Sequence, residues 1–327
     1  MTSIAESPAS ALSVASRQFA DLASGAIQNV AHQYHEVGTA ILRLCSALDR
    51  AEAAGLSCGE MRELVGEARE SHALSPFVRR LQTWPRGYPG DFETIDHLLT
   101  QENRADPVSF GFVIEQYCLG TPLAQQHRNK MQRQTQEVLQ ALLQTDPNAS
   151  SSSFPRVLVL AAGCCPELRA AMPFVQSRDF RAVLCDTDSG AIEFSKHALA
   201  SLGERVVTLE GDVVWCADGI EENGPYDLIA TGGLFDYLDD KWAQRTLGLV
   251  LNDWLAPGGK LFFTNIATLN PFRLWMRCVV DWNVIERTDS QLRELIAGAY
   301  EGAVYIRVER DPTALAHMAT VRRAHGS

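Results

Sequence analysis

The chain has 327 residues, of which 46% are hydrophobic and 21% are charged, as expected of a globular protein with one or two domains. A formal net charge of −11 argues against a general nucleic-acid binder, which needs a concentrated basic surface. No run of ~20 apolar residues is present to span a membrane. The first residues lack the basic start and apolar core of a secretion signal. We therefore expect a cytoplasmic protein, either free or peripheral to the inner membrane.

The cysteine pattern argues against a metal site. Eight cysteines are scattered along the chain, and only Cys164 and Cys165 are adjacent. There is neither a CxxC pair nor a Cys/His spacing suited to zinc. We expect reduced thiols, and disfavour a redox pair at Cys164 and Cys165 because vicinal disulfides are strained.

The N-terminal part is expected to be helical after a disordered segment over residues 1–18. Apolar residues then recur in steps of three and four from Ile27 to Leu48, which predicts one apolar face on a long helix. That face packs either on the rest of the chain or on a second copy in a homodimer. A second helix is predicted over residues 59–68. Together, residues 19–150 are expected to form a helical domain that acts as a substrate lid.

Two later segments of this region carry polar and aromatic side chains. The stretch TWPRGYPGDFETIDHLL combines proline and glycine turn chemistry with Tyr88, and Asp91 can cap a helix that continues through Leu99. Another helix is predicted from Pro122, with HRNK near its start. The polar, serine-rich segment DPNASSSSFP is the expected domain boundary.

Residues 151–327 have the alternating pattern of an α/β domain. Short apolar runs followed by helical periodicity predict a doubly wound, Rossmann-like sheet of seven strands, whose last hairpin is antiparallel. The predicted strands are 157–160, 182–185, 206–209, 226–230, 261–264, 305–308 and 317–321.

The ends of the first three strands carry the candidate site. Ala161, Ala162 and Gly163 form a turn of little bulk, across which a ligand can approach the backbone. Asp186 ends the second strand, where a carboxylate can accept both ribose hydroxyls, although it could also cap a helix. Asp212 ends the third strand and could meet an adenine amino group. A dinucleotide is disfavoured because GxGxxG is missing, so an adenosine ligand without phosphates fits better.

These motifs, in order VLVLAAGCCPE, LCDTD, LEGD, YDLIATGGLFDYL and LAPGGKL, resemble class I S-adenosylmethionine-dependent methyltransferases across residues 154–323. Leu160 stands where that family usually has an acidic residue, and Cys165 where a second glycine is common. The segments YPGDFETID, HRNK, GLFDYLDD, LAPGGKLFFTNIATLNP and WMRCVVDWNVIERT are similar to bacterial methyltransferases that make 3-hydroxypalmitic acid methyl ester, a quorum-sensing signal.

The resemblance implies an enzyme that uses S-adenosyl-L-methionine to methylate the carboxyl group of a 3-hydroxy fatty acid. The alternatives are S- or N-methylation of a small amino acid or natural-product metabolite, and a cofactor-binding regulatory partner without catalysis. The implied cofactor residues are Ala161, Ala162, Gly163, Asp186, Asp212, Val213, Thr231, Gly232 and Leu234. The implied catalytic residues are Tyr88, Asp91, His127, Arg128 and Tyr237, and the implied substrate residues are Phe235, Asn265 and Asn270.

The chemistry of the methyl acceptor decides which catalytic side chains the enzyme needs. A carboxylate is ionised at neutral pH and needs orientation rather than a base, which Arg128 could supply. An amine must lose a proton, so Asp91 or His127 would then act as a base. The apolar residues of PFRLWM and CVVDW are candidates for the wall of an acyl pocket.

Overall fold

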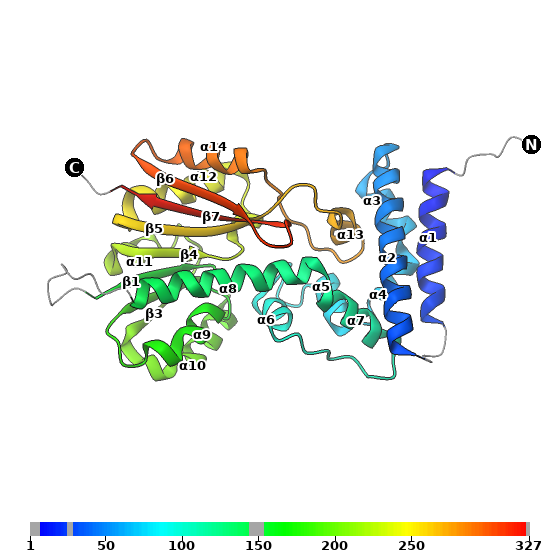
Figure 1. The fold of residues 1–327 in the computed structure, drawn as a ribbon, viewed down its shortest axis with the longest axis horizontal. Coiled ribbons are helices and arrows are strands. Elements are labelled where there is room, and N and C mark those ends of the chain that lie inside the picture. The colour runs from blue at the N-terminus through cyan, green and yellow to red at the C-terminus, as the bar shows by residue number, and fades with distance from the viewer. Residues whose placement is uncertain (1–6, 25–28, 144–153, 325–327) are drawn as a thin grey trace, which may run out of the picture. The chain divides into compact units, whose positions relative to one another are not determined.

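The computed structural model describes residues 7–24, 29–143 and 154–324, and the chain forms two compact units (Figure 1). The helical unit comprises Met1–Gln125 and Leu269–Asn283. The sheet unit comprises Gln126–Thr268 and Val284–Ser327. No helix within the described ranges is long and apolar enough to cross a membrane.

The sheet unit is built on seven strands in the order β3-β2-β1-β4-β5-β7-β6. The first five are parallel, and β7 runs antiparallel to both β5 and β6. This confirms the predicted α/β sheet with its antiparallel end. The strands are β1 (Arg156–Leu160), β2 (Arg181–Asp186), β3 (Val206–Glu210), β4 (Tyr226–Thr231), β5 (Leu255–Ile266), β6 (Val304–Arg310) and β7 (Ala316–Arg323).

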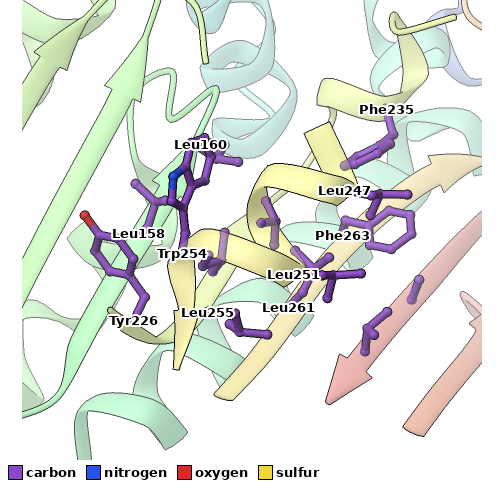
Figure 2. Packing of buried hydrophobic residues seen from close by; sticks show 14 of the residues in the cluster. Leu158, Leu160, Tyr226, Phe235, Leu247, Leu251, Trp254, Leu255, Leu261 and Phe263 are labelled. Carbon is purple, nitrogen blue, oxygen red and sulfur yellow. The ribbon is translucent and has the colours of Figure 1, made fainter. Parts of the chain in front are cut away.

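Alternate residues of each strand face opposite sides of this sheet, which gives two apolar layers. On one side Leu158 and Leu160 of β1 pack with Phe263 of β5 and with the helices after β3, β4 and β5 (Figure 2). These helical segments are α11 (Ala217–Asn223), α12 (Asp240–Leu249), η3 (Val250–Trp254) and α14 (Asp289–Ala299).

On the other side Val157 and Val159 of β1 pack with Val138 and Leu142 of α8 (Pro122–Leu143) and with Leu168 of α9 (Pro166–Val175). Figure 1 shows α8 and α9 on one side of the sheet and α12 and α14 on the other. The connection from β2 to β3 contains α10 (Ser189–Ala198) and η1 (Ala200–Arg205), and η2 (Leu234–Asp236) follows β4. Since helices cover both sides, the ends of the strands are where a ligand can reach the sheet.

The helical unit begins earlier than its sequence indicates. Residues 1–18 were expected to be disordered, but α1 starts at Pro8 and buries Leu12 and Phe19. Its small residues form a helix because the side chain of Ser7 caps its first turn and apolar residues share one face. Residues 1–6 lie outside the described part of the chain. The helices here are α1 (Pro8–Ala23), α2 (Val30–Ala53), α3 (Cys58–Leu64), α4 (Gly66–His72), α5 (Pro76–Thr83), α6 (Phe92–Thr100), α7 (Phe110–Gly120) and α13 (Arg273–Cys278).

The expected apolar face is buried within the helical unit from Val37 to Leu48, whereas Val30 is exposed and Ile27 lies outside the described part of the chain. Val37, Ile41, Leu44 and Leu48 of α2 are each fully buried, and α2 packs against α1 and α7. The single helix predicted over 59–68 is instead two short helices, α3 and α4, which meet at Val65.

The segment Leu269–Asn283 leaves the sheet unit after β5 and belongs to the helical unit. Its α13 contacts α2 and α3, and Trp275 and Trp282 are each only 4% exposed. The sequence predicts this segment to be part of the C-terminal domain and a wall for an acyl chain. Its apolar side chains instead complete the core of the helical unit.

The division between the units also differs from the predicted boundary near residue 150. The serine-rich stretch 146–155 falls mostly on residues 144–153, which lie outside the described part of the chain. The units divide between Gln125 and Gln126, within α8. Most of α8 belongs to the sheet unit because Val138 and Leu142 are buried in the layer beneath β1.

Candidate functional site

A pocket of about 520 Å³ lies at the carboxyl ends of the parallel strands, within the range of small-molecule sites. It opens where β1, β2 and β3 end, at the edge where open α/β sheets bind ligands. Its wall is mostly apolar, with a few polar groups. The lining residues are Ala161, Cys185, Asp186, Thr187, Gly211, Asp212, Val213, Val214, Trp215, Leu234, Leu238, Trp242 and Thr246.

Asp186 is the most buried carboxylate of this pocket. Its side-chain oxygens accept the Gly163 amide at 2.7 Å and the Asp188 amide at 2.9 Å, which fixes the carboxylate across the end of β1. Burial raises the pKa of Asp186 above its ordinary value, and the backbone hydrogen bonds partly oppose that shift. Each oxygen keeps acceptor capacity for a ligand hydroxyl. Asp186 is not the cap of α10, since Asp188 fills that position.

Asp212 and its neighbours form a second wall. The carboxylate accepts the amides of Val214 and Trp215, both at 2.8 Å, which orders the turn after β3. Trp215 is 81% exposed at the rim, and Trp242 of α12 also lines the pocket. Flat apolar surfaces of this kind suit an aromatic base.

The turn after β1 is tightly shaped. Ala161, Gly163 and Cys165 all have positive φ, at 49°, 53° and 44°. Glycine takes such a conformation at no steric cost, but alanine and cysteine are held there against strain, a feature concentrated at functional sites. Ala161 is the exposed residue of this turn, and it lines the pocket.

The expected cofactor residues all lie at this edge of the sheet, but not all of them line the pocket. Ala161, Asp186, Asp212, Val213 and Leu234 are lining residues. Thr231 ends β4 and is fully buried, and Gly232 follows it. Ala162 is 5% exposed and packs in the layer with α8 and α9.

A buried polar network holds the loop after β4. Arg287, 1% exposed, donates to the carbonyls of Phe235 and Leu238 at 2.7 and 2.6 Å and pairs with Asp240. Lys130 of α8 meets Asp236 at 3.0 Å. The network therefore positions Leu234 and Leu238 at the pocket without touching its interior.

This network accounts for two residues expected to bind substrate. Asn265 is fully buried, donates to Asp236 at 3.1 Å, and accepts from Arg287 at 2.8 Å. Phe235 is 1% exposed and faces Phe263, with ring centroids 4.5 Å apart (Figure 2). Both side chains are structural, whereas Tyr237, at 41% exposure, is not part of the core.

Three other expected residues lie in the helical unit. Asp91 is 1% exposed, caps α6 through the amides of Glu93 and Thr94, and pairs with Arg80 at 2.7 Å. Asn270 accepts the Phe272 amide at 3.0 Å. These contacts explain both residues as local structure, and Tyr88 is half-buried in the turn before α6.

His127 and Arg128 lie in the part of α8 that belongs to the sheet unit. Burial, together with the charges of Lys130 and Arg128, holds the pKa of His127 well below its usual value, so the imidazole is neutral at pH 7. Burial also lowers the pKa of Arg128. A neutral imidazole can act as a base, and Arg128 remains a cation.

Several site residues are missed by the sequence patterns. Trp215, Trp242 and Thr246 line the pocket but belong to no strand-end motif, and Leu238 lies in the YDLIATGGLFDYL motif without having been assigned a role. Trp215 could have been found from the sequence, because it follows the strand-end residue Asp212 by three positions, where a turn at the edge of the pocket is expected. Arg287 had none, since its partners are brought together only by the fold.

No protein-family model matches this sequence, and no curated protein matches it either. Similar solved structures include a possible exported protein from Bordetella parapertussis, with 17% identity and a TM-score of 0.59 over 99% of this chain and 100% of that one. Another is the pyocyanin biosynthetic protein PhzM, with 17% identity and a TM-score of 0.43 over 97% of this chain and 95% of that one. A third is magnesium protoporphyrin IX methyltransferase from Synechocystis PCC 6803 with bound SAH, with 12% identity and a TM-score of 0.43 over 62% of this chain and 87% of that one. At TM-scores below 0.5, the last two establish nothing further for this chain. The first shows that the chain shares its fold, from end to end, with a protein whose name assigns no activity.

Proposed function

We propose that this protein is an S-adenosylmethionine-dependent methyltransferase. The observation that carries the proposal is the pocket at the strand ends, where buried Asp186 lies beside the tight turn after β1. The motif order of the sequence and the β3-β2-β1-β4-β5-β7-β6 sheet support it. The pocket at the strand ends would then hold the cofactor, and the substrate would be a small molecule.

The pocket residues fit an adenosine without phosphates. Asp186 would accept the ribose hydroxyls, which are donors that its buried carboxylate needs. Val213, Leu234 and Trp242 would contact the adenine, with Asp212 toward its amino group. The mostly apolar wall would exclude water from these hydrogen bonds and so strengthen them.

When bound, the cofactor supplies a methyl group on a positively charged sulfur. The protein's part is to hold the acceptor in line with that group and to keep water out. Thr231 and Gly232 would border the reacting centre, since β4 ends there. An acceptor carboxylate needs no proton removed at neutral pH, so orientation is the main requirement.

For the acceptor we propose the carboxyl group of a 3-hydroxy fatty acid, giving a methyl ester. The support is the sequence similarity of YPGDFETID, HRNK and GLFDYLDD, together with Arg128 as a cation able to orient a carboxylate. His127 and Tyr237 are the further acceptor-side residues of this proposal, and both belong to the sheet unit. The apolar segment after β5 does not support it, because its side chains are buried in the helical unit.

Asp186→Ala should weaken binding of S-adenosylhomocysteine by about 1–3 kcal/mol, because the ribose hydroxyls lose a buried acceptor. Isothermal titration calorimetry measures the loss, and circular dichroism checks the fold. The control is Asp179→Ala, an exposed aspartate before β2 that lies outside the pocket. Equal affinity in the native chain and Asp186→Ala would remove the ribose assignment.

The acceptor is tested by incubating the protein with labelled S-adenosylmethionine and a panel of 3-hydroxy acids, amino acids and thioethers. We expect a base-labile methyl ester on a long-chain acid, identified by mass spectrometry. A stable N-methyl or sulfonium product would show that the acceptor is a small zwitterion and not a fatty acid. Cofactor binding without transfer to any acceptor would indicate a regulatory partner.

A further inference from the structure

Two cysteines of the helical unit lie with their sulfur atoms in contact. Cys58 is the first residue of α3, Cys278 is the last residue of α13, and their Sγ atoms are 3.6 Å apart. The two residues are separated by 220 positions in the chain, so only the fold brings them together. Both are free thiols. Neither belongs to the pocket at the strand ends, whose lining residues are all in the sheet unit.

Two arginines hold the end of α13 against α3 and α4. Arg69 of α4 donates to the Cys278 carbonyl at 2.9 Å and to the Asp281 carboxylate at 2.7 Å. Arg62, one turn after Cys58 on α3, pairs with the same carboxylate. Asp281 is only 3% exposed, so water screens these ion pairs weakly. The contact between the two sulfurs is therefore fixed by the helices that carry them.

The two thiols differ in access and in protonation. Cys278 is fully buried, whereas Cys58 is half-buried, and the other six cysteines, all within the described ranges, are buried as well. Burial, and then the hydrogen bond to Cys58, raise the pKa of Cys278 to about 12. Cys278 therefore keeps its proton and donates it to the Cys58 sulfur, which helps that sulfur to carry negative charge. Since oxidants attack the thiolate, Cys58 is the sulfur that reacts first.

We propose that Cys58 and Cys278 form a reversible disulfide when the protein meets hydrogen peroxide. The Cys58 thiolate attacks one peroxide oxygen, the O–O bond breaks, and the hydroxide that leaves takes up the Cys58 proton to give water. The Cys278 sulfur then displaces hydroxide from the sulfenic acid at Cys58, and the Cys278 proton leaves with that hydroxide as a second water. Two thiols are oxidised and one peroxide is reduced. Small side-chain rotations bring the sulfurs to the S–S bond length of about 2.0 Å.

The disulfide would join the two stretches of chain that make up the helical unit, Met1–Gln125 and Leu269–Asn283. In the reduced protein these stretches are held together by packing, hydrogen bonds and ion pairs alone. A cross-link between residues 220 positions apart removes much of the freedom of the unfolded chain and so favours the folded state. Oxidation therefore locks the returning segment in place, and reduction releases it.

The test treats the reduced, full-length protein with a small excess of hydrogen peroxide, alkylates the remaining thiols and digests the chain. We expect mass spectrometry to find Cys58 and Cys278 in one linked peptide, with two of the eight thiols lost. Dithiothreitol should restore both thiols. In urea titrations the oxidised protein should unfold at a midpoint higher by on the order of 1 M, because the cross-link restricts the unfolded chain.

Cys58→Ser is the test variant, since a serine at this half-buried position leaves the core of the unit intact. Reduced, it should unfold at the midpoint of the reduced native chain, and peroxide should leave that midpoint unchanged. Cys45→Ala removes a buried thiol of α2 in the same unit and is the matched control, which should still give the linked peptide.

Three results would overturn the proposal. The first is a sulfenic or sulfinic acid at Cys58 without a linked peptide, which would mean that Cys278 does not complete the reaction. The second is a disulfide between two chains, seen as a doubled mass on a denaturing, non-reducing gel. The third is a linked protein whose urea midpoint equals that of the reduced protein, which would contradict the lock on the returning segment.

Discussion

His72 joins three segments of the helical unit through one neutral ring. Its Nδ1–H donates to the Ala68 carbonyl at 2.6 Å, and its Nε2 accepts the Trp275 indole N–H at 3.2 Å. The ring stacks on Phe19 of α1 with centroids 4.1 Å apart. These partners require the uncharged tautomer protonated on Nδ1, and burial lowers the pKa of His72 to about 4.

That shift predicts a loss of stability in mild acid. Below pH 6.5 the His72 ring takes up a proton in the unfolded chain but not in the folded one. The contribution of this residue to the free energy of unfolding is therefore fully present above pH 6.5. The free energy of unfolding should fall as the pH drops from about 6.5 to about 4, by on the order of 3 kcal/mol from this residue. Urea titrations at several pH values measure it.

The matching variant is His72→Gln, which can keep both hydrogen bonds but does not titrate. It should be less stable than the native chain at pH 7, and its stability should vary less with pH between 6.5 and 4. An identical pH profile in both proteins would assign the acid sensitivity elsewhere, with buried His127 the first candidate.

Helix α7 is seated against the turn between α4 and α5 by a glycine. A Cβ built on Gly111 would lie 2.2 Å from the Leu74 carbonyl oxygen and 2.7 Å from its carbon, and neither backbone atom can move aside cheaply. Gly111→Ala should therefore push α7 away and lower the free energy of unfolding by about 2–3 kcal/mol, measured by urea denaturation.

Gly66→Ala is the control for this prediction. Nothing lies within 4 Å of a Cβ built at Gly66, the first residue of α4. Alanine there should be neutral or stabilise by up to about 1 kcal/mol, because it has the higher helix propensity. Similar effects at both positions would mean that helix propensity, not the close approach of α7, decides the result.

Elements with strong local signals were predictable from sequence. The run Val157–Leu160 predicts a strand buried on both faces, and β1 has that position and burial. Asp91 predicts a helix start, and it caps α6. Helix α1 was missed because its buried face consists of few large residues among alanines and serines, so composition suggested disorder.

Polar residues of the site were predictable from sequence only where they directly follow a buried strand. Asp186 and Asp212 follow buried strands, and both line the pocket. Trp242 and Thr246 give no such signal, because α12 reaches the pocket only in the folded chain.

At the scale of the whole molecule, the chain passes between the two units three times. It does so between Gln125 and Gln126, between Thr268 and Leu269, and between Asn283 and Val284. The sequence pattern indicated one boundary, because periodicity shows that a segment is apolar on one face and not which surface it meets. A chain shortened to begin at Ser151 would lack α8, and with it the cover that Val138 and Leu142 give the sheet.

The return of Leu269–Asn283 to the helical unit also sets an order of events during synthesis on the ribosome. The first seven helices emerge before any strand, yet the indole that receives His72 and the Asp281 carboxylate that binds Arg62 and Arg69 come only after β5. Domains generally fold as units once their residues are available. The earliest part of the nascent chain must therefore wait until the first five strands have been made before its own core can close. Its apolar faces are exposed until then and are a natural target for chaperones.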